Sequence, residues 1–275
     1  MKLRIDPRWY VLVNNALLLV LGMVFFGLQR DLVQVGFCFA LGIATELLCD
    51  FLFKKHGQVR VKDRILSAAV ACVSTLILIR SSDWWFYGLL AVVAIASKYV
   101  LVDERGRHFF NPTNLAIVFS LAFMPDHLFV RPDQFSMDQL TFYICVPMVI
   151  GFGVLAMLGA HRWRLTLAYY LTVAGFGVPI GLLLHVKPQW VLAPELNTST
   201  LIFSFLMQTD PRTTPSDSRA QFAFGACVAL LHLTLRYQQV PYSPFVSLFV
   251  VTGLWSLVGR AVAAPKPVPN SSAAA

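Results

Sequence analysis

Asn111-Pro112-Thr113-Asn114 and Thr209-Asp210-Pro211 are two short polar stretches in an otherwise very apolar chain. Each contains a proline and lies beside an apolar segment that is short for crossing a bilayer. Polar groups and broken backbone are costly in hydrocarbon unless they are buried in protein or line a cavity. The two stretches therefore predict that a cofactor or substrate binds between them, inside a membrane protein.

The composition is that of an integral membrane protein. Of the 275 residues, 57% are hydrophobic and 13% are charged, whereas a soluble domain has about 25% charged residues. We expect one membrane domain over residues 1–263, followed by a disordered tail over 264–275 that is rich in Pro, Ser and Ala. The formal net charge of +8 lies in short loops between apolar runs, which is typical of membrane proteins and argues against nucleic acid as a partner.

Ten apolar segments predict an all-α polytopic protein with ten transmembrane helices. They cover about residues 10–28, 32–53, 65–79, 84–102, 113–124, 138–159, 163–185, 199–207, 220–235 and 243–259. If the loops alternate between the two sides, 16 lysines and arginines lie on one side and 5 on the other, with Lys98 inside the fourth segment. Cytoplasmic loops carry the excess of positive charge, so both termini are predicted to be cytoplasmic.

Ten helices divide into two halves of five, about 1–130 and 131–263, and an odd number of helices per half makes the halves inverted. The third segment of each half, 65–79 and 199–207, is short. Matching short segments in inverted halves indicate a site that lines a cavity. We therefore expect some helices to be short or broken near the binding site.

The first polar stretch has two interpretations. Asn111 is a suitable N-cap and Pro112 suits a first helical turn, so the stretch is explained as the capped start of the fifth helix. Alternatively, the spacing of three residues puts the amides of Asn111 and Asn114 on one helix face. Each amide offers a donor and an acceptor, which suits the alternating carbonyl and N–H groups of a flavin ring.

The second polar stretch follows nine apolar residues, which make about 14 Å of helix. Asp210 is therefore expected within membrane depth rather than at the surface. The alternative is a surface turn that also caps the ninth helix. In the predicted topology both polar stretches lie on the cytoplasmic side.

Two ionisable residues lie inside apolar segments, Glu46 in the second and Lys98 in the fourth. Such residues usually pair and mark functional regions, so we expect an ion pair beneath the two polar stretches. The alternative is that Lys98 extends to the membrane surface and that Glu46 is purely structural. No metal site or catalytic set is predicted: the cysteines lack the spacing for a metal or a disulfide, and the scattered histidines do not indicate haem.

The chain resembles the membrane component that two bacterial complexes share: the D subunit of the Rnf electron-transport complex and the B subunit of the sodium-translocating NADH:quinone reductase. The residues that carry the resemblance are Glu46, Asp63, Leu66-Ser67-Ala68-Ala69-Val70, Trp84-Trp85, Lys98, Phe110-Asn111-Pro112-Thr113-Asn114, Met207-Gln208-Thr209-Asp210-Pro211, Arg219 and Phe224-Gly225. The Phe-Asn-Pro and Thr-Asp-Pro elements, in this order and topology, are its most specific part.

This resemblance implies a ten-helix flavoprotein of two inverted halves in the bacterial inner (plasma) membrane, with electron transport coupled to sodium or proton movement. It implies riboflavin or FMN, held non-covalently by Asn111, Asn114 and Asp210, with Thr113 and Thr209 beside them. The protein would be an electron-transfer subunit rather than a free-standing catalyst. Other redox subunits would be its partners.

Two departures from the family pattern stand out. Family members carry a Ser-Gly-Ala-Thr motif whose threonine bonds FMN covalently; residues 174–198 lack it, so covalent FMN is not expected. A charged stretch replaces the glycine-rich one expected between Lys98 and Asn111. The chain thus resembles a divergent, stand-alone branch, similar to membrane relatives found near enediyne biosynthesis genes. A transporter of a small polar solute such as riboflavin, and a scaffold subunit without cofactor, stay open as alternatives.

Overall fold

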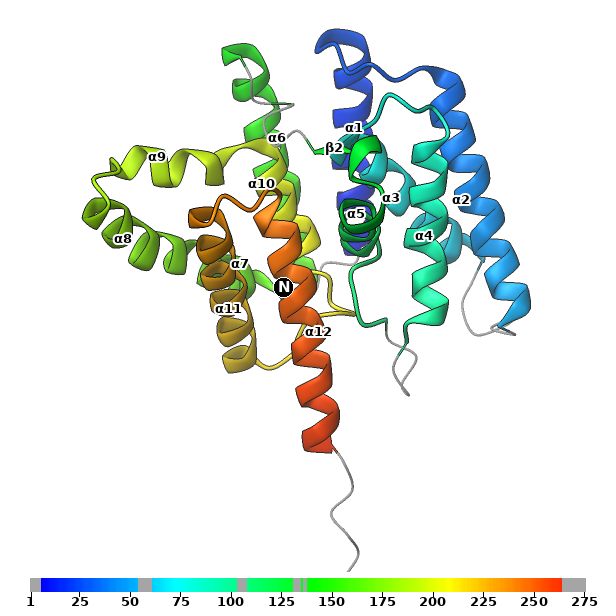
Figure 1. The fold of residues 1–275 in the computed structure, drawn as a ribbon. Helices are drawn as coiled ribbons and strands as arrows, with labels where there is room; N and C mark the ends of the chain where they lie inside the picture. The colour runs from blue at the N-terminus through cyan, green and yellow to red at the C-terminus, as the bar shows by residue number, and fades with distance from the viewer. Residues whose placement is uncertain (1–5, 54–60, 103–107, 131–134, 136–137, 264–275) are drawn as a thin grey trace, which may run out of the picture.

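A computed structural model describes residues 6–53, 61–102, 108–130, 135 and 138–263. These residues are mainly helical (Figure 1). The α-helices are α1 (Pro7–Phe25), α2 (Leu32–Leu52), α3 (Val61–Leu78), α4 (Phe86–Val100), α5 (Pro112–Phe123), α6 (Gln139–Gly159), α7 (Trp163–Thr172), α8 (Val178–Leu183), α9 (Pro188–Leu192), α10 (Thr198–Ile202), α11 (Ser218–Tyr237) and α12 (Ser243–Ala263). The tail predicted over residues 264–275 lies outside the described residues.

Short helical pieces of other types join these helices. The π-helix η2 (Val173–Gly177) connects α7 to α8, and the π-helix η4 (Phe203–Met207) continues α10. Two 3₁₀ helices, η1 (Pro125–His127) and η3 (Ala193–Leu196), lie before α6 and α10. π-Helical turns are frequent at functional sites, and η4 leads directly to the second polar stretch of the sequence.

The local sequence explains where many helices begin. Asp31 and Asp138 each accept the backbone N–H of the third helical residue, and the side chains of Gln34 and Thr141 accept the N–H of the capping residue in return. Single aspartate or asparagine N-caps begin four further helices: Asp6, Asn111, Asn197 and Asp217. These caps satisfy backbone donors that have no partner inside the helix.

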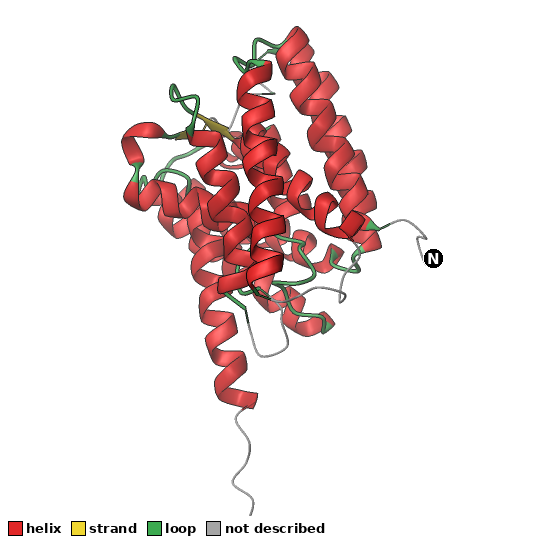
Figure 2. Cartoon of the chain, turned by 90° about the vertical axis from the view of Figure 1, so that its right-hand side faces the viewer, coloured by secondary structure: helices red, strands yellow, loops and turns green. Residues whose placement is uncertain are grey.

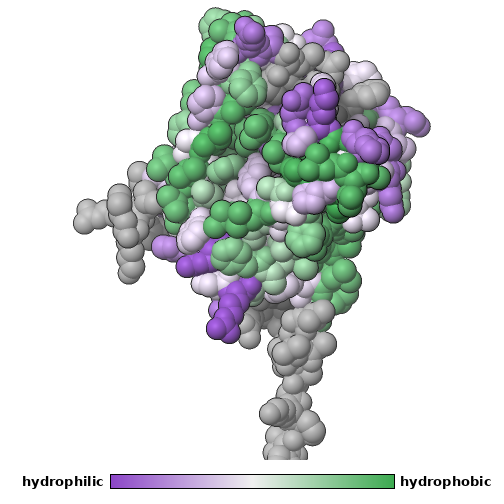
Figure 3. Space-filling view, turned by 90° about the vertical axis from the view of Figure 1, so that its left-hand side faces the viewer, coloured by the Kyte–Doolittle hydropathy of each residue, from purple (hydrophilic) through white to green (hydrophobic). Residues whose placement is uncertain are grey.

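The molecule is a polytopic all-α membrane protein. Within the described part of the chain, five helical spans are long and apolar enough to cross a membrane: Pro7–Phe25, Leu32–Leu52, Gln139–Gly159, Trp163–Leu183 and Ser218–Tyr237. Large apolar side chains such as Phe51 and Leu183 are more than half exposed, as lipid-facing residues would be. Figure 3 shows a face on which hydrophobic side chains dominate the middle and hydrophilic ones gather above and below.

Each of the ten predicted apolar segments contains helix, although the number of membrane crossings stays a prediction. The expectation that the third segment is short is wrong, because α3 begins at Val61 and has 18 residues. Polar residues extend it at its N-terminus, where the buried guanidinium of Arg64 forms an ion pair with Asp50 of α2. The eighth segment is short and ends at Met207, as predicted.

The helices pack in the same order in the first and the second part of the chain. Among the first five, α1 packs against α3, α2 against α4, and α4 against α5. Among the later ones, α6 packs against α10 and η4, α7 against α11, and α11 against α12. The two sets meet where α1 packs against α6 and α5 against α12 (Figure 1).

One very small sheet accompanies the helices. Strand β1 (Ile79–Arg80) follows α3 directly and pairs antiparallel with β2 (Phe129–Val130), with Ile79 opposite Val130 (Figure 2). The pairing ties the end of α3 to the connection between α5 and α6. It lies at the opposite end of α3 from Val61, and so away from the polar turns at the start of that helix.

Candidate functional site

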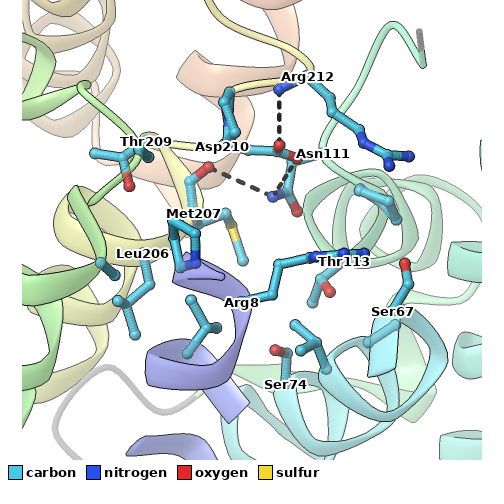
Figure 4. Close-up of a pocket in the computed structure, with 18 of the residues that line it drawn as sticks. Arg8, Ser67, Ser74, Asn111, Thr113, Leu206, Met207, Thr209, Asp210 and Arg212 are labelled. Carbon is cyan, nitrogen blue, oxygen red and sulfur yellow. Dashed lines mark hydrogen bonds between the residues drawn. The ribbon is translucent and has the colours of Figure 1, made fainter. Parts of the chain in front are cut away.

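A cavity of about 250 Å³ lies where α1 and α5 begin and where η4 ends. Its apolar wall comes from α1, α3 and the α10–η4 segment and includes Val11, Val70, Ala71, Ile202 and Leu206. Its polar wall comes from the two stretches that the sequence singled out, together with charged residues near the start of α1. The two stretches, about a hundred positions apart in the sequence, therefore share one cavity (Figure 4).

Asn111 links the two stretches directly. It is the N-cap of α5, and its Oδ1 accepts the backbone N–H of Asn114 at 3.1 Å. Its Nδ2 points to the loop after η4, 3.4 Å from the carbonyl of Met207 and 3.5 Å from Oδ2 of Asp210 (Figure 4). Both of these contacts are at the long limit of a hydrogen bond. The amide N–H groups can therefore also donate to a molecule in the cavity.

Asp210 supplies a carboxylate at the same wall. Its Oδ1 accepts the backbone N–H of Arg212 at 3.0 Å, and its Oδ2 lies 3.6 Å from Nε2 of His108. Burial raises the pKa of Asp210, but the interactions with His108 and Arg212 outweigh burial and hold that pKa below its usual value. An ionised carboxylate, which accepts hydrogen bonds only, therefore stands at the cavity.

The two threonines of the predicted site also line the cavity. Thr113 is buried in the first turn of α5. Thr209 is buried too, and its hydroxyl donates to the carbonyl of Phe205 one turn earlier, at 2.5 Å. Because that hydroxyl already donates to the preceding helix, Thr209 shapes the cavity wall and does not donate a hydrogen bond into it.

The structure does not put Asn114 on the cavity wall. Its side chain is buried, and Nδ2 donates to the carbonyl of Phe245 on α12 at 3.1 Å. Asn111 is the N-cap of α5 and Asn114 lies in its first turn, yet only Asn111 lines the cavity, because the amide of Asn114 is held by the carbonyl of Phe245 on α12. Asn114 instead joins α5 to α12.

Glu46 and Lys98 lie together beneath the cavity. Nζ of Lys98 is 2.6 Å from Oε2 of Glu46 and 3.1 Å from the hydroxyl of Ser67, and Tyr99 donates to Oε1 of Glu46 at 2.8 Å. Lys98 also lines the cavity, and both charged side chains are buried. The pair therefore joins α2 to α4 and sets a cationic group against the cavity wall.

The sequence did not single out several charged residues at the cavity. Arg8 forms a salt bridge of 2.6 Å with Asp6, and its Nη1 donates to the carbonyl of Asp63 at 3.2 Å. Arg212 follows Asp210 by two residues and also lines the cavity, as does His108. In the sequence, Arg8 and Arg212 were used only as positive charges of cytoplasmic loops. Their positions beside helix ends were the feature that could have indicated a role at the cavity.

The inner end of the cavity is polar as well. Asn14, Asn15 and Ser74 are buried; Asn14 Nδ2 donates to Asn15 Oδ1 at 2.9 Å, and Asn15 Nδ2 donates to Ser74 Oγ at 2.9 Å. Asn15 and Ser74 line the cavity from α1 and α3. The sequence signal was a pair of asparagines inside an apolar segment, where unpaired amides are costly.

Together these residues make a cavity with apolar walls and polar groups at both ends. Such an arrangement is typical of small-molecule sites in general. Within the described part of the chain, no cluster of three or more His, Cys, Asp or Glu residues has the arrangement of a metal site.

Comparison with known proteins identifies relatives of this chain. A sequence model described as the NQR2, RnfD, RnfE family matches residues 7–143 and 139–251. The D subunit of the Na(+)-translocating ferredoxin:NAD(+) oxidoreductase complex of Acetobacterium woodii is 23% identical, over 77% of this chain and 74% of the relative. The D subunits of the ion-translocating oxidoreductase complexes of Pectobacterium carotovorum subsp. carotovorum and of Pectobacterium atrosepticum are each 22% identical, over 79% of this chain and 81% of the relative.

Proposed function

The chain belongs to the NQR2, RnfD, RnfE family, and on this basis we propose that it is a membrane flavoprotein. It relays electrons between a cytoplasmic donor and another redox partner, through a riboflavin or FMN that is held without a covalent bond. The flavin supplies the redox chemistry, and the protein binds it, orients it and sets its potential.

The observation that carries this proposal is the meeting of Asn111 and Asp210 at one cavity. Two polar elements from distant parts of the sequence lie 3.5 Å apart there, between Nδ2 and Oδ2, next to an apolar wall. Burying such groups is costly unless they bind each other well or bind a ligand. Their mutual contact is long, so the arrangement is better explained by a third molecule between or beside them.

The residues present fit the chemistry of a flavin. The apolar wall of α1, α3 and η4 suits the faces of a flat ring, and the amide of Asn111 suits a ring carbonyl. The carboxylate of Asp210 would accept a hydrogen bond from a ring N–H or from a ribityl hydroxyl. Lys98 and Arg8 set positive charge against the cavity, which favours the more negative, reduced form of a bound flavin.

The proposal extends to the setting of the protein. The relatives are named as D subunits of ion-translocating oxidoreductase complexes, so other redox-protein subunits are the proposed partners. We assign the chain to a bacterial plasma membrane with both termini cytoplasmic, because most of the lysines and arginines fall on one side of the alternating loops. On this orientation the cavity opens towards the cytoplasm.

We also propose that the chain consists of two inverted halves, about 1–130 and 131–263, with ten crossings. The repeated packing order supports this, since the contacts of α2 with α4 and of α4 with α5 have counterparts between α7 and α11 and between α11 and α12. The cavity then lies at the junction of the halves, between α1 and α5 of one and η4 of the other.

An absorption spectrum of the purified full-length protein tests the proposal. We expect a yellow, fluorescent protein whose absorption corresponds to about one flavin per chain. On acid precipitation all of the flavin should be released into the supernatant. Flavin that stays with the precipitate would contradict the non-covalent mode. A colourless but folded protein would contradict the flavoprotein proposal and favour a scaffold subunit without cofactor.

Matched variants test which residues hold the flavin. Asn111→Ser keeps an N-cap oxygen for α5 but removes the amide donor. Asn197→Ser makes the same exchange at the N-cap of α10, away from the cavity, and is the control. We expect Asn111→Ser and Asp210→Leu to lower the flavin content at least tenfold, and Asn197→Ser to leave it unchanged. Equal flavin in all four proteins would remove the assigned site.

A transporter of a small polar solute is the second candidate function. It is favoured by a second cavity, of about 170 Å³, that Ser199, Thr200 and Phe203 of the α10–η4 segment help to line, while Ile202 and Leu206 of the same segment line the first cavity. Substrate sites of transporters are typically formed by interrupted helices. Uptake of labelled riboflavin into vesicles that contain the protein would favour this function, because an electron relay moves no solute.

A further inference from the structure

Glu195 is a buried acidic residue that the sequence did not single out. It lies in η3, between α9 and α10, and is 2% exposed. Oε1 accepts a hydrogen bond from Nη1 of Arg236 at 2.9 Å and lies 3.0 Å from Nε2 of His232. Oε2 accepts a hydrogen bond from the hydroxyl of Tyr169 at 2.9 Å. Because an arginine is always charged and points at this oxygen, Glu195 is an ionised carboxylate.

The contacts of His232 fix the tautomer of its neutral ring. An ionised carboxylate only accepts hydrogen bonds, so Nε2 must carry the proton that is shared with Glu195. Nδ1 is then the unprotonated nitrogen, and it accepts the hydroxyl of Ser243, 3.0 Å away. His232 is 3% exposed and lies well inside α11. The neutral ring therefore offers one basic site, and that site is covered by a hydroxyl group.

The basic site adjoins the second cavity. His232 and Ser243 line this cavity together with Glu195, Arg236 and Tyr242. Its other walls include hydroxyl and amide residues of the α10 region, Asn197, Ser199 and Thr200. A cavity of about 170 Å³ with several polar partners has room for a few water molecules. The hydroxyl of Ser243 thus stands between cavity water and Nδ1.

The second cavity includes residues near the C-terminal end of α11. Helix α11 begins at Ser218, just after the loop of Arg212 that lines the first cavity, and rises about 21 Å from there to His232. Residues of η3, of α10 and of the turn before α12 line the second cavity together with α11. His232 and the loop of Arg212 therefore lie at different depths of the bundle, although the two cavities approach each other at Ile202 and Phe203.

The charged and titratable groups around His232 come from every element that packs on it. Glu195 comes from η3, Arg236 from α11 itself, Tyr169 from α7 and Tyr242 from the turn before α12. The ring of Tyr169 stacks on that of His232, with centroids 5.9 Å apart. With His232 neutral, one carboxylate balances one guanidinium. The cluster can therefore gain a single proton at His232 without a second charge change.

We propose that His232 is a proton-binding site, held between Glu195 and Ser243 and filled from the second cavity. In the loading step, Ser243 gives its hydroxyl proton to Nδ1 of His232 and takes a proton from a hydronium ion in the cavity, which leaves as water. One N–H bond forms, one hydronium O–H bond breaks, and the serine hydroxyl is restored. No group is oxidised or reduced.

Hydrogen bonds link the proposed site to the α10–η4 segment, which lines both cavities. The backbone carbonyl of Glu195 accepts the hydroxyl of Tyr170 at 3.2 Å, and that hydroxyl lies 2.9 Å from Oγ of Ser204 in η4. Ser204 is followed in η4 by Leu206 and Met207, which line the first cavity. This chain of contacts connects Glu195, the partner of His232, to the wall of the first cavity.

Nitrogen NMR of the full-length chain in liposomes, with ¹⁵N-labelled histidine, tests the proposal. His232→Gln identifies the signals of His232 by their loss. Spectra are recorded in a series from about pH 8 to about pH 5, and we expect the neutral ring, protonated on Nε2, to gain a second proton at Nδ1 as the sample is acidified. A ring of His232 that stays neutral over this whole range would overturn the proposal and leave a purely structural network.

Two further variants give opposite expected shifts. Glu195→Gln removes the carboxylate and should move the midpoint of the conversion to lower pH by about one unit or more, whereas Arg236→Gln removes a like charge and should move it to higher pH. The exposed His185 is the internal control, since its conversion should not move in either variant. If neither variant moves the midpoint of His232, the assigned site is wrong.

Ser243→Ala keeps the proposal testable if a charge variant fails to fold. It removes the hydroxyl that covers Nδ1, so the Nδ1 signal of the neutral ring should shift and proton exchange with water should slow severalfold. An unchanged Nδ1 signal would contradict the relay through Ser243. The flavin content of each sample, measured in parallel, should equal that of the wild type, so this test and the test of the flavin site fail independently.

Discussion

Asn111 combines two tasks in one side chain. Its oxygen caps α5 and its amide nitrogen reaches the loop of Met207 and Asp210. The cap fixes the position of the carboxamide, because the oxygen cannot leave the Asn114 N–H without a loss of about 1 kcal/mol. The donor is therefore held towards the cavity before any ligand binds, which lowers the cost of ordering the site.

The ion pair of Lys98 and Glu46 gives a prediction at the same scale. Lys98→Met leaves a buried carboxylate with Tyr99 as its remaining donor and should lower the free energy of unfolding by about 3–5 kcal/mol. The double variant Lys98→Met with Glu46→Leu should recover most of that loss. Unfolding of the detergent-solubilised protein by denaturant measures both.

A surface exchange is the control for this prediction. Arg80→Met removes an exposed contact with Gln29 and should change the free energy of unfolding by no more than about 0.5 kcal/mol. A double variant whose loss of stability equals the sum of the losses of Lys98→Met and Glu46→Leu alone would mean that the two side chains act independently. In that case the pair would not hold α2 against α4.

The lowered pKa of Asp210 predicts a pH dependence. The carboxylate stabilises the folded state fully above its ordinary pKa of 3.8, and this contribution is lost as the pH falls through the lower folded pKa. The difference in melting temperature between wild type and Asp210→Asn should therefore be constant from pH 7 to about pH 5 and shrink below pH 3.8. A difference that stays constant down to pH 2 would contradict this account.

At the scale of the elements, the contact between α7 and α11 depends on one glycine. A Cβ atom at Gly225 would collide with the carbonyl of Leu165 and come within 3.1 Å of Cβ of Ala168. The obstacle is backbone, so the helices would have to move apart. This explains why small residues occur where membrane helices approach closely.

Gly225→Ala should therefore destabilise the protein by about 1–3 kcal/mol. Gly151 of α6 is the matched control, because a Cβ there meets nothing within 4 Å. Gly151→Ala should be neutral or stabilising, since alanine favours helix over glycine by about 1 kcal/mol. Thermal unfolding of the two variants in the same detergent measures the difference. Equal effects would mean that close helix packing does not explain Gly225.

The short α10–η4 segment takes part in both proposed sites. It lines both cavities, and its π-helical part leads to Asp210. Thr166 and Tyr170 of α7 bond Ser204 within it, at 2.7 and 2.9 Å. The α10–η4 helix is too short to span the membrane, and these polar contacts fix its depth in the bundle.

At the scale of the whole molecule, the proposed orientation is open to a direct test. Lys187 and Asp217 are both exposed but lie on opposite sides in the predicted topology. Single cysteines at these positions, in a Cys227→Ser background whose other four cysteines are buried, should react differently with a membrane-impermeant maleimide. In intact cells Lys187→Cys should be labelled and Asp217→Cys should require permeabilised cells. The reverse pattern would invert the topology and move the first cavity to the outer side.

The sequence by itself determined the class of the protein, the start of α5 at Asn111 and the two polar elements, because hydropathy and capping depend on residues close together in the chain. Helices begin after Asp31, Asn111 and Asp138, because each of these side chains accepts the backbone N–H of the residue three positions later. Only the tertiary structure decided which side chains meet. It turned Asn114 towards α12, brought Asp210 to Asn111, and assembled Glu195, His232 and Arg236 from separate elements. The physical reason is that a side chain in an apolar surrounding must find a polar partner, and helix packing determines which partner is within reach.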